Sequence, residues 1–234
     1  MGIDIATGFV WFVSFLFSTT VHEAMHALVA WRLGDPTAYN GGQVSLSPIP
    51  HIKREPIGML VLPLLTAMTQ GWAIGWASAP YDPRWANRYP QRAALMAAAG
   101  PLGNFLIAAA AFAAMRVGLG LGAFAAPDRA NFETIVAAST GDGSFVTMLL
   151  SVLLVQNVLL GVFNLLPLPP LDGAAVVGAV LPEPLAATLR QFGSNPMAST
   201  MGLLVAWQVF PALTGPLFTW VLRLVHPGAG YGPG

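Results

Sequence analysis

The sequence predicts an all-α membrane protein that crosses the bilayer several times. Hydrophobic residues fill 55% of the 234 positions and charged residues only 9%, against roughly 25% in a soluble domain. Apolar stretches of spanning length recur along the chain, and no connector between them is long enough to fold into a soluble domain of its own. We therefore expect a single membrane-embedded domain over residues 1–234.

The apolar segments each approach or exceed the ~20 residues that a helix needs to cross the hydrocarbon core. The last one contains Pro211 and Pro216, so it is read either as one kinked span or as two short pieces. About five or six apolar helices are expected. The segments are residues 5–33, 57–77, 93–115, 145–166 and 197–225.

The first segment carries a His-Glu-x-x-His motif at residues 22–26. Ionisable side chains are expensive inside an apolar span and usually have a function there. On a helix, His22 and His26 share one face with Cβ atoms about 5–6 Å apart, so both imidazoles can bind one zinc ion. Glu23 is predicted to be a general base that takes a proton from water, not a ligand. The alternative, a buried histidine pair without metal, is unfavourable in hydrocarbon.

The connector at residues 34–56 is where the sequence allows some β structure. Polar and apolar side chains alternate over residues 41–48 after a glycine pair, which indicates a short strand or the edge of a β-hairpin. Extended chain around residues 44–47, or the proline-rich chain near residue 172, would suit an extended substrate that pairs by strand addition.

Two histidines leave a catalytic zinc site one protein ligand short, because such sites use three protein ligands and an open position. A His-Glu-x-x-His-x-x-Gly-x-x-His motif is excluded, since position 32 is Arg32. Asp172 follows an apolar helix and a proline-rich stretch, whereas the other carboxylates lie at the termini or in polar connectors. Irregular chain at membrane depth is tolerated inside the protein or beside a watery cavity. We therefore expect this broken segment to offer the carboxylate of Asp172 within the bundle.

The depth of the site predicts how the helices run. His22 lies about 17 residues into its helix, or ~25 Å, and is therefore near the end of that helix. Asp172 follows a full-length helix, so residues 5–33 and 145–166 should run in the same direction, with an odd number of crossings between them. Because only two apolar segments lie between them, we predict that residues 57–77 fold back as a re-entrant segment with both ends on one side.

Three stretches together resemble the site-2 protease family of intramembrane zinc metalloproteases. They are the motif at residues 22–26, Ala-Gly-Pro-Leu-Gly-Asn at residues 99–104, and Asn-Leu-Leu-Pro-Leu-Pro-Pro-Leu-Asp-Gly at residues 164–173. The similarity covers roughly residues 15–182 and points to the compact bacterial and archaeal branch without PDZ or CBS modules. For Asn104, close packing of helices by the small residues around it is as good a reading as a role at the site.

The resemblance implies a role for the matching residues. It implies that His22, His26 and Asp172 hold one zinc ion per chain, and that Glu23 is the general base. It also implies that Asn164 helps to place the substrate or to polarise its carbonyl group.

Peptide hydrolysis is the function on which the residues and the resemblance agree. The expected enzyme is a zinc metalloendopeptidase that spans the cell membrane several times. It would hydrolyse peptide bonds in or near the transmembrane helices of single-span membrane proteins, as in regulated intramembrane proteolysis. A helical substrate must unwind first, because its carbonyl groups are engaged in the helix, so substrates should contain helix-weakening residues.

Other classes of function have less support in the sequence. A non-proteolytic membrane protein that uses zinc structurally, or that binds partners at this site, would normally have four ligands and no idle base. A transporter would be indicated by repeated halves with paired broken helices, which the sequence does not contain. Ten basic and ten acidic residues give no net charge and no basic stripe for nucleic acid, and the lack of cysteine excludes thiolate ligands and cysteine nucleophiles.

Overall fold

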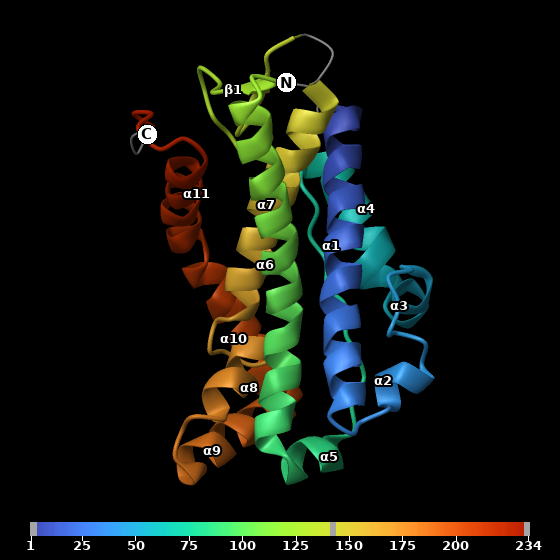
Figure 1. Ribbon diagram of the computed structural model, residues 1–234. Coiled ribbons are helices and arrows are strands. Elements are labelled where there is room, and N and C mark those ends of the chain that lie inside the picture. Colours follow the sequence, from blue (N-terminus) through green and yellow to red (C-terminus); the bar gives the residue numbers. More distant parts are fainter. Residues whose placement is uncertain (1–3, 141–143, 232–234) are drawn as a thin grey trace.

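The computed structural model describes residues 4–140 and 144–231 and consists mainly of helices (Figure 1). Within these ranges, three single helices are long and apolar enough to cross a membrane: α1 (Ile5–Arg32), α6 (Pro90–Gly120) and α7 (Ser144–Asn164). These helices correspond to three of the predicted apolar segments. The predicted fold class, an all-α polytopic membrane protein, is confirmed.

The C-terminal apolar segment forms two helices joined by a bend. α10 (Pro196–Val209) and α11 (Pro211–Val225) meet at an angle of 51°. Pro211 begins α11, and a proline there lacks the N–H that would continue the hydrogen-bond ladder of α10. Pro216 lies inside α11 without ending it. Only together do the two helices have the length of a membrane span, so the pair corresponds to a broken span or a re-entrant loop.

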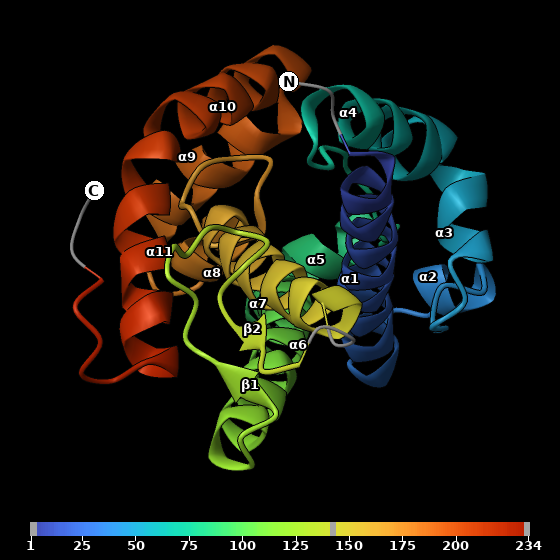
Figure 2. The same cartoon turned by 90° about the horizontal axis from the view of Figure 1, so that it is seen from above.

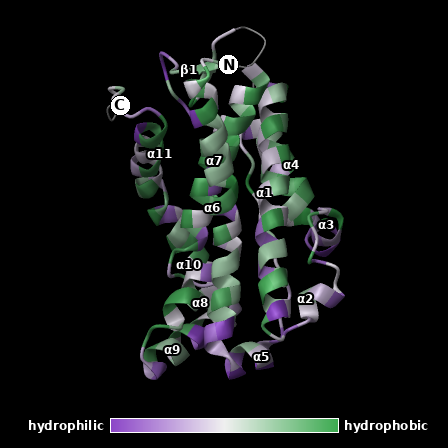
Figure 3. Ribbon diagram, in the orientation of Figure 1, coloured by the Kyte–Doolittle hydropathy of each residue, from purple (hydrophilic) through white to green (hydrophobic). Residues whose placement is uncertain are grey.

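α1 and α7 run in the same direction and α6 runs opposite to both, as predicted from the depth of the site (Figure 1). Seen from the end of the bundle, these three helices lie at the centre. α2 (Thr37–Asn40), α3 (Ile49–Arg54) and α4 (Leu62–Gln70) lie on one side, and α10 and α11 on the other (Figure 2). Apolar residues cover the long helices, while hydrophilic residues gather near α5 (Pro83–Arg88) and α9 (Glu183–Ser194) (Figure 3).

Apolar clusters hold the long helices together, among them one that joins Ala30 of α1 to Met96 of α6. Met115, Val155 and Val221 belong to a cluster that joins α6, α7 and α11. Phe15 and Val152 belong to a second cluster, which joins α1 to α7 and to the chain around α4. Since lipid is as apolar as these side chains, close packing rather than removal from water stabilises such contacts inside a bilayer.

Residues 57–77 fold back on themselves, as predicted. A short π-helix, η1 (Ile57–Val61), continues into α4. α4 is followed by Gly71 in the left-handed conformation, with φ of 81°. The chain then returns in extended form, and the N–H of Trp76 donates to the carbonyl of Gly58 (3.1 Å). A Cβ at Gly58 would lie 2.3 Å from the carbonyl oxygen of Trp76, so this close return requires glycine.

The prediction of a strand at residues 41–48 is wrong. This stretch forms turns and bends between α2 and α3. Gln43 is buried, and its side chain donates to the carbonyl of Ser78 (3.1 Å), so a side-chain hydrogen bond takes the place of a strand ladder. Elsewhere in the described residues, β1 (Phe124–Ala125) pairs with β2 (Ala137–Ala138) as a small antiparallel sheet in the connector between α6 and α7.

The fold predicts on which side of a membrane the connectors lie. Single cysteines are introduced at Lys53 and Arg84, which flank the re-entrant segment, and at Asp128, at the opposite end of α6. The chain has no native cysteine to remove. In sealed vesicles, a membrane-impermeant maleimide should label the first two from the same side and Asp128→Cys from the other. Labelling of Lys53→Cys and Arg84→Cys from opposite sides would show that residues 57–77 cross the bilayer.

Candidate metal centre

His22, Glu23 and His26 are buried on α1, with exposed fractions of 7%, 4% and 6%. Because the two histidines are four residues apart on a helix, their rings lie on one face. The ring centroids are 4.6 Å apart, and the two Nε2 atoms are 3.0 Å apart. Each of the three residues offers one ligand atom within 4.8 Å of the others. α1 alone therefore supplies two imidazole nitrogens and a neighbouring carboxylate.

A proline-rich loop at residues 165–171 connects α7 to α8 (Asp172–Gly178). A Cβ at Gly173 would lie 2.2 Å from the carbonyl oxygen of Leu165, so the tight turn requires glycine at this position. The loop interrupts the helices as predicted. Asp172 itself, however, lies in the first turn of α8 and not in unwound chain.

The carboxylate of Asp172 reaches both histidines. Its Oδ2 lies 3.2 Å from Nε2 of His22 and 3.3 Å from Nε2 of His26. Together with the 3.0 Å between the two nitrogens, these distances describe a nearly regular triangle of three potential ligand atoms. Residues far apart in the sequence thus converge on one point.

Hydrogen bonds on the far side of each imidazole fix its tautomer. Nδ1 of His26 lies 2.7 Å from the carbonyl oxygen of Met96, which can only accept, so this nitrogen carries the hydrogen. Nδ1 of His22 lies 2.6 Å from Oδ1 of Asn104 and donates to it for the same reason. In the neutral rings, each Nε2 therefore presents a lone pair to the centre of the triangle.

Asn104 is held by a chain of buried polar side chains. Its Nδ2 donates to Oδ1 of Asn157 on α7 (2.9 Å) and lies 3.4 Å from the carbonyl oxygen of Ser18. Asn157 in turn donates to the hydroxyl of Ser18 (2.9 Å), and all three residues are fully buried. Because the amide nitrogen of Asn104 is occupied in this way, its oxygen must face His22. Three helices thus cooperate to orient one imidazole.

The three converging atoms suit a zinc ion. Ligand atoms at about 2.0–2.1 Å from a tetrahedral zinc ion are separated from each other by about 3.3–3.4 Å, close to the observed 3.0–3.3 Å. Two imidazole lone pairs and a carboxylate without a hydrogen between them repel each other unless a cation lies among them. His22, His26 and Asp172 could therefore hold zinc and leave a fourth position open.

Glu23 lies beside this triangle on α1. Its Oε2 is buried and makes no hydrogen bond within the described residues. Burying a carboxylate oxygen without a hydrogen bond costs free energy. Such an oxygen is typical of a group that takes part in a reaction. The arrangement can thus present a base next to a metal ion.

Asn164 is placed differently from the other predicted site residues. It is the last residue of α7 and is half-buried, and its Nδ2 donates to the carbonyl of Leu160 (3.0 Å). The structure shows no hydrogen bond from Asn164 to the two histidines, Glu23 or Asp172. The structure therefore brings four of the five predicted residues together and leaves Asn164 at the entrance of the proline-rich loop.

Comparison with known proteins gives the family of the chain. The family model of Peptidase family M50 matches residues 10–207. The chain belongs to this family, the site-2 proteases. No solved structure matches the chain significantly.

Several bacterial proteins are similar to this M50 chain over most of its length. The Bacillus subtilis protein named "Putative zinc metalloprotease YwhC" is 30% identical over 89% of the chain and 83% of its own length. Two proteins named Rip2, with the same description, match as well. That of Mycolicibacterium smegmatis is 28% identical over 90% of the chain and 69% of its own length, and that of Mycobacterium tuberculosis is 30% identical over 87% and 68%. Membership of the family makes the protein a metalloprotease and implies zinc.

In this M50 protein, the backbone of α6 forms the back wall of the site. A Cβ at Gly100 would lie 2.3 Å from Nε2 of His26 and 2.6 Å from Nε2 of His22. Pro101 follows, and it removes one N–H from the helix ladder beside the site. Position 100 can therefore carry no side chain while the imidazoles remain where they are.

Two residues of the site gave only a weak signal in the sequence, or none. For Asn104, the sequence favours helix packing and a role at the site equally, and the hydrogen bond to His22 supports a role at the site. No motif in the sequence marks Asn157. The signal that could indicate its role is an amide side chain inside the strongly apolar sequence of α7, because a buried polar side chain in a membrane span usually has a partner.

We expect Gly100→Ala to lose the metal ion while Gly120→Ala keeps it. Both glycines lie in α6, and a Cβ at Gly120 meets open space. In a helix, Gly→Ala normally raises the free energy of unfolding by roughly 0.5–1 kcal/mol. Any loss of stability or of zinc in Gly100→Ala therefore reports the clash with the imidazoles. Zinc content by mass spectrometry and thermal unfolding would be compared for the two variants. Full zinc occupancy in Gly100→Ala would contradict the assignment of α6 as the back wall.

Proposed function

We propose that this protein is a zinc endopeptidase that cleaves within the membrane. It would hold one zinc ion per chain, span the cytoplasmic membrane several times, and hydrolyse peptide bonds in or near the transmembrane helices of single-span membrane proteins. The observation that carries the proposal is the convergence of His22 and His26, on a helix of spanning length, with Asp172 of α8. Beside them, Oε2 of Glu23 is buried without a hydrogen bond in the described residues.

Each residue has a distinct part in the proposed reaction. Zinc held by His22, His26 and Asp172 would supply a Lewis acid that polarises the scissile carbonyl and makes water more acidic. Glu23 accepts a proton from the attacking water and then donates it to the nitrogen of the leaving amine as the C–N bond breaks. No covalent bond to the protein is formed. Asn104 keeps the imidazole of His22 in the tautomer that binds metal.

The substrate must lose its helical hydrogen bonds before it can react. In an intact helix, each carbonyl oxygen is engaged with an N–H four residues further on, so the scissile carbonyl is not free. Residues that weaken a helix, such as glycine and proline, would favour the required unwinding. Asn164, at the end of α7, is the proposed polar contact for the unwound substrate, and its Nδ2 would have to leave the carbonyl of Leu160 to make it.

We expect Glu23→Gln to abolish cleavage and to keep zinc. The substitution removes the base without removing a proposed ligand, so the rate should fall by at least about 10²-fold. The purified protein in detergent is incubated with a synthetic single-span peptide of about 30 residues with a glycine-rich centre. Cleavage is followed by mass spectrometry with and without chelator. Unchanged cleavage by the variant, or by the wild type in the presence of chelator, would refute the proposed mechanism.

Asp172→Ala should weaken zinc binding itself and thereby also remove activity, because it deletes one of three ligands. Asp128→Ala, which removes an exposed carboxylate at the other end of the molecule, serves as the matched control. Zinc content is measured after dialysis against a buffer of low free zinc. The ligand assignment would be rejected if Asp172→Ala retained as much zinc as the control.

A further inference from the structure

A cavity of about 740 Å³ lies between α1, the extended chain after α4, α7, and the bend between α10 and α11. Its walls are mainly aromatic and aliphatic, as expected of a site for an apolar ligand. The aromatic side chains that line it are Trp11, Phe15, Trp72, Phe132, Phe163, Trp207 and Phe210.

Gln156 is the buried one among the polar residues of this lining, which also include Asp4, Thr7, Gln70, Glu133 and Thr214. It is only 4% exposed, and its Oε1 makes no hydrogen bond within the described residues. Another polar group of the wall is satisfied, since Nε1 of Trp11 donates to Oε1 of Glu133 (3.1 Å). A buried acceptor without a partner is expensive, so its retention at the wall of a cavity points to a partner that arrives with a ligand.

The cavity shares two walls with the metal centre. On α1, Phe15 lines the cavity, and His22 lies seven residues further on, which is the same face about 10 Å along the helix. On α7, Gln156 is adjacent to Asn157, which holds Asn104 and through it His22. A ligand in the cavity would therefore lie within about 10 Å, measured along α1, of the proposed site of cleavage.

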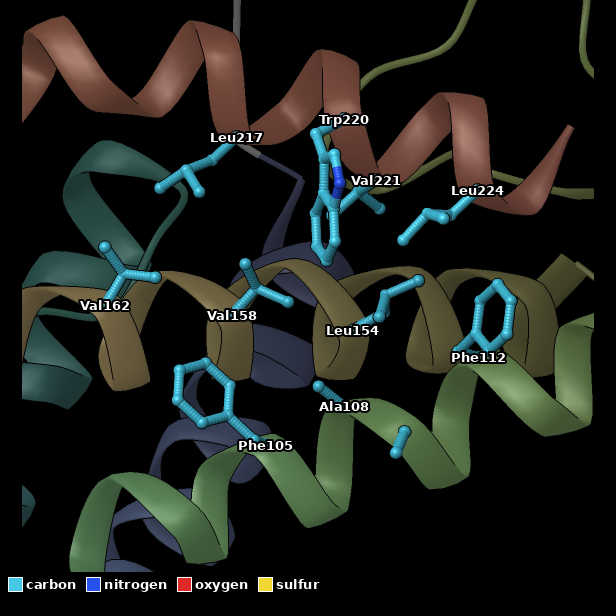
Figure 4. A pocket seen from close by; sticks show the side chains of 11 residues that line it. Phe105, Ala108, Phe112, Leu154, Val158, Val162, Leu217, Trp220, Val221 and Leu224 are labelled. Atoms are coloured by element: carbon cyan, nitrogen blue, oxygen red, sulfur yellow. The ribbon is translucent and has the colours of Figure 1, made fainter. Parts of the chain in front are cut away.

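A second cavity has an exclusively apolar lining and can be compared with the first. It has a volume of about 610 Å³ and lies between α6, α7 and α11 (Figure 4). Its lining consists of side chains such as Phe105, Val158 and Trp220, which project into it from the three helices (Figure 4). An acyl chain would satisfy such a surface. It would not satisfy Gln156 in the first cavity, because an acyl chain has no hydrogen-bond donor.

We propose that the cavity beside the metal centre binds an unwound apolar segment of the substrate. Oε1 of Gln156, which is covered in this structure, then turns toward the cavity and accepts a hydrogen bond from one of the backbone N–H groups of that segment. This inference rests on the proposed peptidase function. A helical segment has its N–H groups engaged internally, whereas an unwound segment in apolar surroundings must find new acceptors for them. Gln156 would thus favour the unwound substrate over the helical one.

Gln156→Leu tests this role, with Gln191→Leu as the control on the exposed face of α9. Removing an unpartnered buried acceptor should leave thermal stability unchanged or raise it. Binding of the synthetic single-span peptide should weaken by about 3- to 10-fold, as expected for the loss of one hydrogen bond. The binding is measured in a Glu23→Gln background, where no cleavage occurs, and KM is measured in the active enzyme. A purely structural role would instead lower stability and leave peptide binding unchanged, which would overturn the proposal.

Peptides with a single N-methylated backbone nitrogen identify the partner of Gln156. Methylation at one position near the cleavage site should weaken binding to the wild type as much as Gln156→Leu does, and should have no further effect in that variant. Equal effects of every methylation in both proteins would overturn the inference. So would a variant that binds the peptide normally but retains more copurified phospholipid, which would identify a lipid site. Absence of wild-type cleavage together with intact, Gln156-dependent binding would refute the peptidase function alone.

Discussion

Close contact between α1 and α6 is the interaction on which the metal centre depends. Because Gly100 has no side chain, the two helices approach each other until the backbone of α6 lies against both imidazoles. The same approach brings the carbonyl of Met96 and the amide of Asn104 within hydrogen-bond distance of His26 and His22. The positions of α7 and α8 follow from this contact, since Asn157 on α7 holds Asn104, and α8 packs against α6 with its carboxylate facing the rings.

Much of this arrangement follows from the sequence because the bilayer limits the possibilities. An apolar run of spanning length must be helical, and the spacing of His22 and His26 then places both on one face. The need for a third ligand at the same depth singles out Asp172, and equal depth fixes the relative direction of α1 and α7. The fold-back of residues 57–77 follows from the same count of crossings, without any local signal strong enough to show it alone.

The remaining features depend on contacts that leave no periodic trace in the sequence. Asn157 acts through Asn104, and hydrogen bonds between distant side chains are not encoded in the spacing of either residue. Gln43 bonds to the carbonyl of Ser78 and so disrupts a stretch whose alternation indicates a strand. The actual strands, β1 and β2, have two residues each, too few for an alternating pattern. Local sequence patterns thus predict the helices of this protein. Where a local pattern fails, as at residues 41–48, a hydrogen bond between distant parts of the chain determines the structure.

The distance in sequence between the parts of the site has a consequence for biosynthesis. α1 leaves the ribosome first with two histidines and a glutamate that must enter the bilayer, while Asp172 follows about 150 residues later. At translation rates of about 5–20 residues per second, that delay is on the order of ten seconds. During this interval the nascent helix lacks the third of the proposed zinc ligands. On the proposed mechanism the protein is therefore made in an inert form, and it becomes active only when its C-terminal third has been inserted.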